Sequence, residues 1–170
     1  MITFQSTQTV RMATAILEYR EDDLAFDTTP RPVGAISSLM LNDVELMSDE
    51  RTGAILFVTG YCLFQSWIPA HLDPPQSQPN VLIPVLDTPL QPGVSVRLHS
   101  PSKGDRWPVF ADPETGWVRL GLGQDHPAEV MEFAPGALAL LDDNRALMSL
   151  WLRPVALPRG FSAGSRNQVS

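Results

Sequence analysis

The chain has 170 residues, of which 44% are hydrophobic and 18% charged, a balance that fits one folded domain and argues against wholesale disorder. Its formal net charge of −7 repels phosphate backbones, which disfavours nucleic acid as a partner. No apolar run approaches the ~20 residues that span a bilayer, no secretory signal pattern is present, and the single cysteine, Cys62, allows no internal disulfide, so we expect a cytoplasmic protein without a membrane segment.

Sixteen prolines and eleven glycines interrupt the chain so often that few long windows could form a helix. Short apolar runs between turn signals instead predict about ten to twelve short strands and at most short helices. We expect a mostly β fold, built as an antiparallel sandwich or a partly open barrel. In chain order, the runs that predict strands are residues 13–19, 24–26, 36–41, 44–47, 54–63, 81–86, 94–99, 109–111, 117–120, 130–133, 137–141 and 146–152.

The domain organisation follows from where these runs stop. We expect a single β domain over residues 1–158, with two similar halves at about 10–63 and 104–157. A proline-rich connector, residues 64–103, joins the halves and begins with the longest predicted loop. Small and polar residues predict a flexible tail at 159–170.

Two tight turns in the second half predict β-hairpins. In residues 111–117, Pro113 fixes φ early in the turn and Gly116 can adopt the positive φ that such turns need. In residues 142–145, an Asp-Asp-Asn-Arg sequence lies between two apolar runs, and Asp and Asn tolerate left-handed backbone.

Segments 93 residues apart repeat a strand–turn–strand pattern. Residues 17–24 align with 110–117, and residues 44–50 align with 137–143. After a one-residue slip inside a turn, residues 53–58 align with 145–150. Equal spacing over about forty residues favours an internal duplication, while the alternative is a chance likeness between two β-meanders.

Each half also resembles a family of small bacterial proteins of unknown function known as DUF2283. The family pattern is a tyrosine, an acidic turn, a short strand and then a glycine-rich hairpin with an acidic turn. The first half carries it in residues 19–26 and 44–58, and the second half in residues 117–120 and 132–152. The second half lacks the tyrosine before its turn and the glycine near Arg145. The resemblance implies a small β fold and no activity.

Several strands are apolar on both faces, which a sheet with one solvated face does not show. The runs at 54–58, 137–141 and 146–152 do not alternate with polar residues. A second sheet covers one face, and the other needs a loop, a barrel wall or a second subunit. We therefore predict a homodimer, with a monomer covered by its own proline-rich loop as the alternative.

A metal site is the first chemistry to consider, because three histidines lie near carboxylates. His71 precedes Asp73 by two residues, Asp125 precedes His126, and His99 ends a predicted strand. Imidazole and carboxylate groups are ligands for zinc and related metals, so these residues could assemble a site in space. Their spacings match no known ligand motif, so we assign no metal and no cofactor and expect each histidine at the surface or in a hydrogen bond.

Motifs for catalysis are weak. Cys62 lies in an apolar run, where a thiol packs as a small hydrophobe with a high pKa. The sequence has no Gly-x-Ser-x-Gly elbow and no glycine-rich phosphate loop before a helix. Its carboxylate clusters fall in turns, where they are normally solvated. We assign no catalytic residue.

Tryptophan supplies the binding candidates, since four of them are many for this length. Trp67 and Trp107 flank the connector, and large flat rings suit a ligand groove. Together with His71 and His99 they form the predicted ligand-binding set of a pocket between the halves. The alternative is that all four tryptophans pack in the core.

The function these observations favour is a non-enzymatic binding or interaction module, with a basic protein as a partner for its acidic surface. The alternative is a binder of a small molecule or glycan in a pocket between the halves, and the third hypothesis is a small metal-dependent enzyme. With Lys103 as the one lysine among twelve basic residues, the composition indicates a GC-rich, bacterial origin. A deep pocket that gathers histidines or tryptophans from both halves would favour the second hypothesis.

Overall fold

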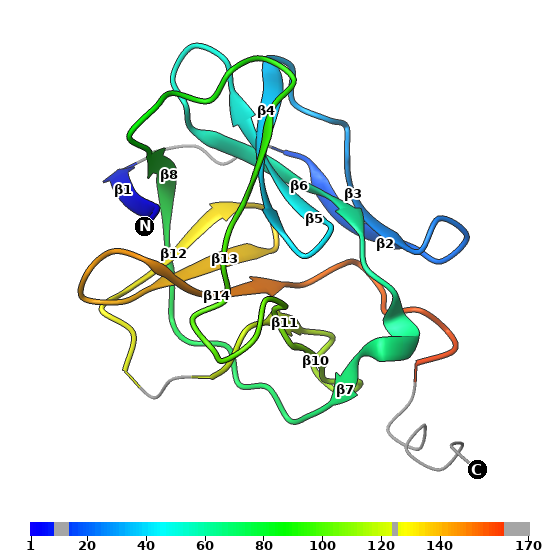
Figure 1. The fold of residues 1–170 in the computed structure, drawn as a ribbon. Coiled ribbons are helices and arrows are strands. Elements are labelled where there is room, and N and C mark those ends of the chain that lie inside the picture. Colours follow the sequence, from blue (N-terminus) through cyan, green and yellow to red (C-terminus); the bar gives the residue numbers. More distant parts are fainter. Residues whose placement is uncertain (9–13, 124–125, 162–170) are drawn as a thin grey trace.

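The computed structural model describes residues 1–8, 14–123 and 126–161, and in them the chain forms two β-sheets that pack against each other (Figure 1). These residues contain fourteen strands and one short 3-10 helix, η1 (Phe64–Ser66). The predicted mostly β sandwich is confirmed. Of the predicted tail, residues 162–170 lie outside the described residues.

The strands divide unequally between the two sheets. In spatial order, the eight-stranded sheet contains β1 (Thr3–Gln8), β8 (Gln78–Val85), β12 (Glu129–Ala134), β13 (Ala137–Leu141), β14 (Leu147–Leu152), β11 (Val118–Leu120), β10 (Val109–Ala111) and β7 (Ile68–Pro69). The six-stranded sheet contains β2 (Ile16–Arg20), β3 (Ala25–Thr29), β6 (Ile55–Tyr61), β5 (Val44–Asp49), β4 (Ala35–Leu41) and β9 (Ser95–Arg97).

Each of the twelve predicted runs overlaps a strand, and the structure adds β1 and β7. Strand β1 escapes an apolar search because Phe4 is its one large hydrophobic residue. The pairing is also less uniform than expected, since β4–β9, β8–β12 and β7–β10 are parallel. The two strands of each of these pairs are far apart in the sequence, so the chain can return to the same end of the sheet and run in the same direction again. Strands joined by a hairpin are antiparallel.

The main core lies between the sheets. Phe4 of β1, Phe26 of β3 and Leu150 of β14 are fully buried there, although the sequence separates them widely. Burying one such side chain stabilises the fold by about 1.5–3 kcal/mol. Both halves of the chain and the N-terminal strand therefore contribute to one core.

A second apolar cluster covers the outer face of the eight-stranded sheet. Leu138, Met148 and Trp151 point to that face, and Leu72 from the proline-rich loop packs on them with 1% of its surface exposed. The loop therefore supplies the cover that the two-faced apolar strands need. A homodimer is not required for that purpose and stays a prediction.

The two sheets repeat one arrangement of strands. The order β2-β3-β6-β5-β4-β9 in one sheet corresponds to β10-β11-β14-β13-β12-β8 in the other. In both series the last pair is parallel and the preceding pairs are antiparallel. The aligned segments of the sequence thus occupy matching places in the fold.

The registers match too, with one correction to the alignment. Val44 pairs with Gly60, and Ala137 pairs with Leu152. Val44 and Ala137 are 93 residues apart, whereas Gly60 and Leu152 are 92 apart, so the one-residue slip falls between the paired strands, in the turn, as the alignment has it. Phe26 also pairs with Gly60, and Val118 pairs with Leu152. Phe26 and Val118 therefore occupy equivalent positions in the two sheets, and they are 92 residues apart in the sequence. The alignment of residues 17–24 is therefore wrong by one position. The number of residues in a polar turn cannot be judged from the sequence pattern, which explains the error. A one-residue error in the alignment exchanges the two faces of the strand.

Candidate functional site

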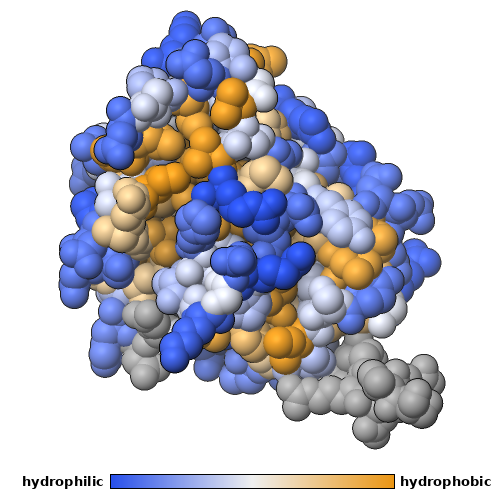
Figure 2. Space-filling model, in the orientation of Figure 1, coloured by the Kyte–Doolittle hydropathy of each residue, from blue (hydrophilic) through white to orange (hydrophobic). Residues whose placement is uncertain are grey.

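A mostly apolar hollow of the described surface opens between the two sheets. It has a volume of about 600 Å³ and lies between β9, with the segment that follows it, and the β13–β14 hairpin. Figure 2 shows hydrophobic surface beside the N-terminal end and the segment that crosses the front of the molecule. We call this hollow the intersheet pocket, and its lining residues are Met1, Ile2, Val96, Arg97, Leu98, His99, Ser100, Pro101, Trp107, Asp142, Ala146, Leu147 and Met148.

Trp107 is held rigidly in the wall of the intersheet pocket. The Asn42 side chain donates a hydrogen bond to the Trp107 carbonyl oxygen at 2.8 Å and accepts one from the Trp107 backbone N–H at 2.9 Å. The indole Nε1 donates to the Leu98 carbonyl oxygen at 2.9 Å. Asn42 lies in the turn between β4 and β5 with φ of 54°, a conformation that asparagine tolerates. The ring is therefore fixed before any ligand arrives.

Polar groups lie around the apolar wall. Arg97 and His99 are exposed, and Asp142 belongs to the β13–β14 turn. Asp142 is committed to that turn, because its Oδ1 accepts backbone N–H bonds from Asn144 and Ala146. An apolar cavity with a guanidinium and an imidazole group at its rim suits an apolar ligand that carries a polar or anionic end.

The structure splits the predicted ligand-binding set. His99 and Trp107 line the intersheet pocket together, but none of its described lining residues belongs to the first half, residues 10–63, so it lies between the connector and the second half. Trp67 and His71 line two other hollows, of about 320 and 340 Å³. Trp67 and Trp107 line different hollows, although Ser66 and Ile68, next to Trp67 in the chain, share a third hollow with Trp107.

Trp67 is a core residue. Its ring stacks on Phe26 at 5.9 Å and meets Tyr19 edge-on at 5.0 Å. Its Nε1 donates to the Cys62 sulfur at 3.2 Å, and the Tyr19 hydroxyl donates to the Cys62 carbonyl oxygen at 2.6 Å. Burial raises the pKa of the Tyr19 phenol well above its usual range. The group fastens η1 to the six-stranded sheet.

His71 lies over a buried aspartate on the outer side of the eight-stranded sheet. Its Nδ1 is 3.3 Å from Asp112 Oδ2, and its Nε2 is 3.2 Å from Asp73 Oδ1. Asp112 is 2% exposed and accepts backbone N–H bonds from Leu72 and Glu114 at 2.8 Å. Burial alone would raise the pKa of Asp112, but the backbone donors outweigh it and hold the pKa below its usual value.

The three histidines do not form one ligand set. Across the described residues, the groups of three or more potential metal ligands comprise one only, His71 with Asp112 and Glu114. His99 lines the intersheet pocket, and His126 is exposed. Asp125, which the sequence analysis placed beside His126, lies outside the described residues.

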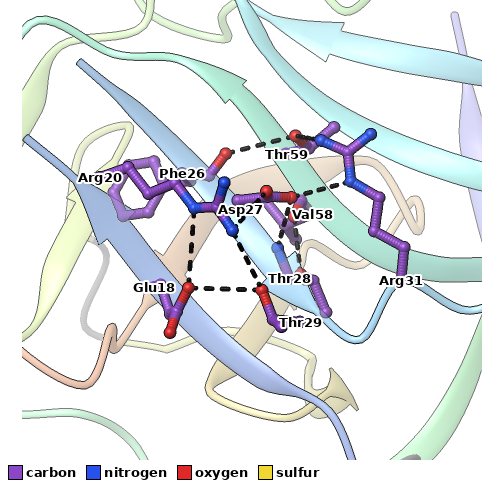
Figure 3. Close-up of polar contacts among 9 residues, drawn as sticks. All are labelled: Glu18, Arg20, Phe26, Asp27, Thr28, Thr29, Arg31, Val58 and Thr59. Carbon is purple, nitrogen blue, oxygen red and sulfur yellow. Dashed lines mark hydrogen bonds and ion pairs between the residues drawn. The ribbon is translucent and has the colours of Figure 1, made fainter. Parts of the chain in front are cut away.

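The carboxylate of Asp27 illustrates how the acidic residues of the first half are used (Figure 3). It lies on β3, not in a turn, and its Oδ1 accepts bonds from the Thr28 backbone at 2.8 Å and Arg31 Nε at 2.9 Å. Its Oδ2 is 3.4 Å from Arg20. Two guanidinium groups pair with the Asp27 carboxylate, an arrangement that suits a structural role.

Sequence reasoning missed the residues that complete the intersheet pocket. Ile2 and Ala146 reach it from opposite ends of the chain, and Asn42 positions Trp107 from a turn 65 residues away. The Asn-Asp turn between two apolar runs was the one local signal for Asn42. The other two gave none, because their place depends on pairing between distant strands.

No helix in the described part of the chain is both long and apolar enough to span a bilayer. The chain matches no protein-family model, and no curated protein matches it. A function is therefore inferred from the geometry of the intersheet pocket.

Proposed function

We propose that this protein is a non-enzymatic binding module that holds a compact apolar molecule in the intersheet pocket. One observation carries the proposal: side chains of both sheets, together with His99 and Trp107 from the segment after β9, line an apolar hollow of about 600 Å³. Small-molecule sites typically enclose roughly 300–1,000 Å³ and have mostly apolar walls with a few polar groups. The hollow falls inside that range.

Trp107 is 2% exposed and belongs to the main core, so it offers the hollow a fixed wall and not an open ring face. A wall that Asn42 and Leu98 already hold in place loses little freedom when a ligand packs against it. We propose an apolar ligand whose polar end meets Arg97 and His99.

A binding role fits the polar groups of the pocket better than a catalytic one. Catalysis by a nucleophile needs a base within hydrogen-bond reach. The Ser100 hydroxyl instead lies 2.7 Å from the Ser102 hydroxyl, and Asp142 serves its own turn. The polar groups at the rim therefore suit recognition.

Anilinonaphthalene sulfonate is a suitable probe, because it combines flat rings with an anionic group and becomes fluorescent in apolar sites. Ala146 is half-buried in the pocket wall, so Ala146→Trp fills the hollow. We expect one bound probe per chain and a loss of affinity of about tenfold or more in this variant. Ala156→Trp, at an exposed position, is the matched control and should bind like the unchanged protein. Equal binding by both variants would refute the proposal.

We also propose a cytoplasmic location and retain the homodimer and a basic protein partner as proposals. The single, buried and unpaired Cys62 supports a reducing compartment. Strand β2 ends the six-stranded sheet and exposes Ile16 by 51%, which supports edge-to-edge pairing of two copies. The net charge of −7 supports attraction to a basic surface.

A further inference from the structure

The surroundings of His71 call for a cation between its ring and Asp112. A neutral imidazole has one N–H, and both ring nitrogens of His71 face carboxylate oxygens, at 3.2 and 3.3 Å. If Nε2 carries the proton and donates it to Asp73, the lone pair of Nδ1 points at Asp112 Oδ2. Two lone pairs at that distance repel unless a positive charge lies between them. A second proton or a metal ion supplies it.

Asp112 has one acceptor position left for this purpose. Its Oδ1 serves the backbone N–H groups of Glu114 and Thr115, and its Oδ2 accepts one N–H bond, from Leu72. A carboxylate oxygen has two lone pairs, so the second lone pair of Oδ2 is directed elsewhere. The 3.3 Å contact places His71 Nδ1 on that side.

We propose that His71, Asp112 and Glu114 bind a divalent transition metal ion at the turn between β10 and β11, and that Zn²⁺ fits these ligand types best. Bonds of about 2.0–2.1 Å at tetrahedral angles place two ligand atoms about 3.3 Å apart, which is the distance from His71 Nδ1 to Asp112 Oδ2. Ligand atoms of all three residues lie within 4.8 Å of one another. Glu114 is exposed and turns inward to complete the set.

Asp73 acts as a positioning residue for this site. Metal-binding histidines usually donate their other ring N–H to a carboxylate, which fixes the tautomer and strengthens the metal bond. Asp73 Oδ1 lies 3.2 Å from His71 Nε2 and fills that role. One histidine and two carboxylates also leave room for a water molecule or an external ligand on the ion.

Isothermal titration of the full chain with zinc chloride tests the proposal. We expect one Zn²⁺ per chain with a dissociation constant below about 0.1 mM, abolished by His71→Gln and weakened about tenfold or more by Glu114→Gln. Asp73→Asn should weaken binding about tenfold, a change that a solvated side chain would not cause. His99→Gln, which alters a histidine in the intersheet pocket, is the matched control and should bind zinc like the unchanged protein.

Several results would overturn the metal site. One is zinc binding that survives His71→Gln. Another is the absence of binding by the unchanged chain at about 0.1 mM zinc, the upper limit expected for the dissociation constant. Far-ultraviolet circular dichroism of each variant separates lost binding from lost folding. The probe titration of the intersheet pocket is independent, so failure here leaves the proposed function standing.

Discussion

Cys62 shows at the scale of one residue how burial decides chemistry. The thiol lies in the aromatic cluster of Tyr19 and Trp67 and accepts a hydrogen bond from Trp67 Nε1. Burial raises the pKa of the Cys62 thiol from its ordinary 9.0 to about 11, and the bond from Trp67 offsets only part of that rise. The thiolate, which is the reactive form, is therefore rare at neutral pH.

We predict that Cys62 reacts with a disulfide reagent such as Ellman's reagent only on unfolding at pH 7. The same protein in denaturant is the control and should react within minutes. Because the folded state keeps the proton to higher pH than the unfolded chain, the free energy of unfolding should fall as the pH rises from 9.0 towards about 11. Fast labelling of the native protein at pH 7 would contradict this assignment.

At the same scale, the sequence predicted residues whose surroundings are local and failed for the others. The inert character of Cys62 followed from the apolar run around it, and Gly116 adopts the positive φ of 78° that its turn predicted. The placement of His99 and His71 in two different hollows has no such local cause. It depends on which sheet each segment joins, and a single sequence carries no pattern for that.

Among the elements, the β13–β14 turn holds the N-terminal strand β1 and strand β12 of the eight-stranded sheet through the side chain of Arg145. Arg145 has φ of 64°, and its Nε donates to the Phe4 carbonyl oxygen at 2.6 Å. The guanidinium also pairs with Glu129 of β12 at 2.9 Å, and Glu129 accepts a bond from Ser6. One side chain in a strained backbone position thus ties β1 and β12 to the hairpin.

We predict that Arg145→Ala destabilises the protein more than Arg145→Gly does. Both changes remove the bonds to β1, which contribute about 1 kcal/mol in this half-exposed place. Alanine keeps the unfavourable positive φ, whereas glycine adopts it without strain, so the glycine variant should be more stable than the alanine variant by about 1 kcal/mol. Urea unfolding measures the difference, and an alanine variant equal to or more stable than the glycine variant would contradict the strained turn.

The proline-rich loop is the second element with a structural task. It packs Leu72 on the outer cluster of Leu138, Met148 and Trp151. The sequence predicted that these strands are apolar on both faces, and it named a loop, a barrel wall or a second subunit as the cover, with this loop as the alternative to a homodimer. It could not decide between a loop and a second subunit, because hydrophobicity specifies that a face is buried but not what buries it.

We predict that Leu72→Ala lowers the free energy of unfolding by about 2–5 kcal/mol and promotes self-association by uncovering the outer cluster. Leu122→Ala, at a residue 47% exposed, is the matched control and should change stability by less than about 0.5 kcal/mol. Urea unfolding and light scattering provide the two readouts. Equal effects of the two substitutions would show that the loop does not cover the sheet.

On the scale of the whole molecule, the matching strand orders make a repeat that sequence identity alone supports weakly. Both matching series of six strands end in a parallel pair, and both central hairpins carry a register shift at the aligned position, after Met47 and after Leu140. Hydrophobic runs predicted the strands, and equal spacing predicted the correspondence. The separation of the halves into two facing sheets follows from long-range pairing, which the runs do not encode.

The intersheet pocket is a product of that arrangement. Strand β9 ends one sheet, and the β13–β14 hairpin of the other sheet faces it across the hollow that Trp107 lines. Two of its residues were predicted because aromatic and imidazole side chains stood out in a polar segment. The residues opposite them are ordinary alanine, leucine and methionine, which carry no functional signal until the sheets are placed.

Two-dimensional ¹H–¹⁵N NMR of the tryptophan indole groups shows whether a ligand enters the intersheet pocket. On titration with anilinonaphthalene sulfonate, we expect the Trp107 signal to shift to saturation at one equivalent while the signals of Trp117 and Trp151, on the outer face, stay in place. A shift of Trp117 and Trp151 without any change at Trp107 would contradict a ligand site between the sheets.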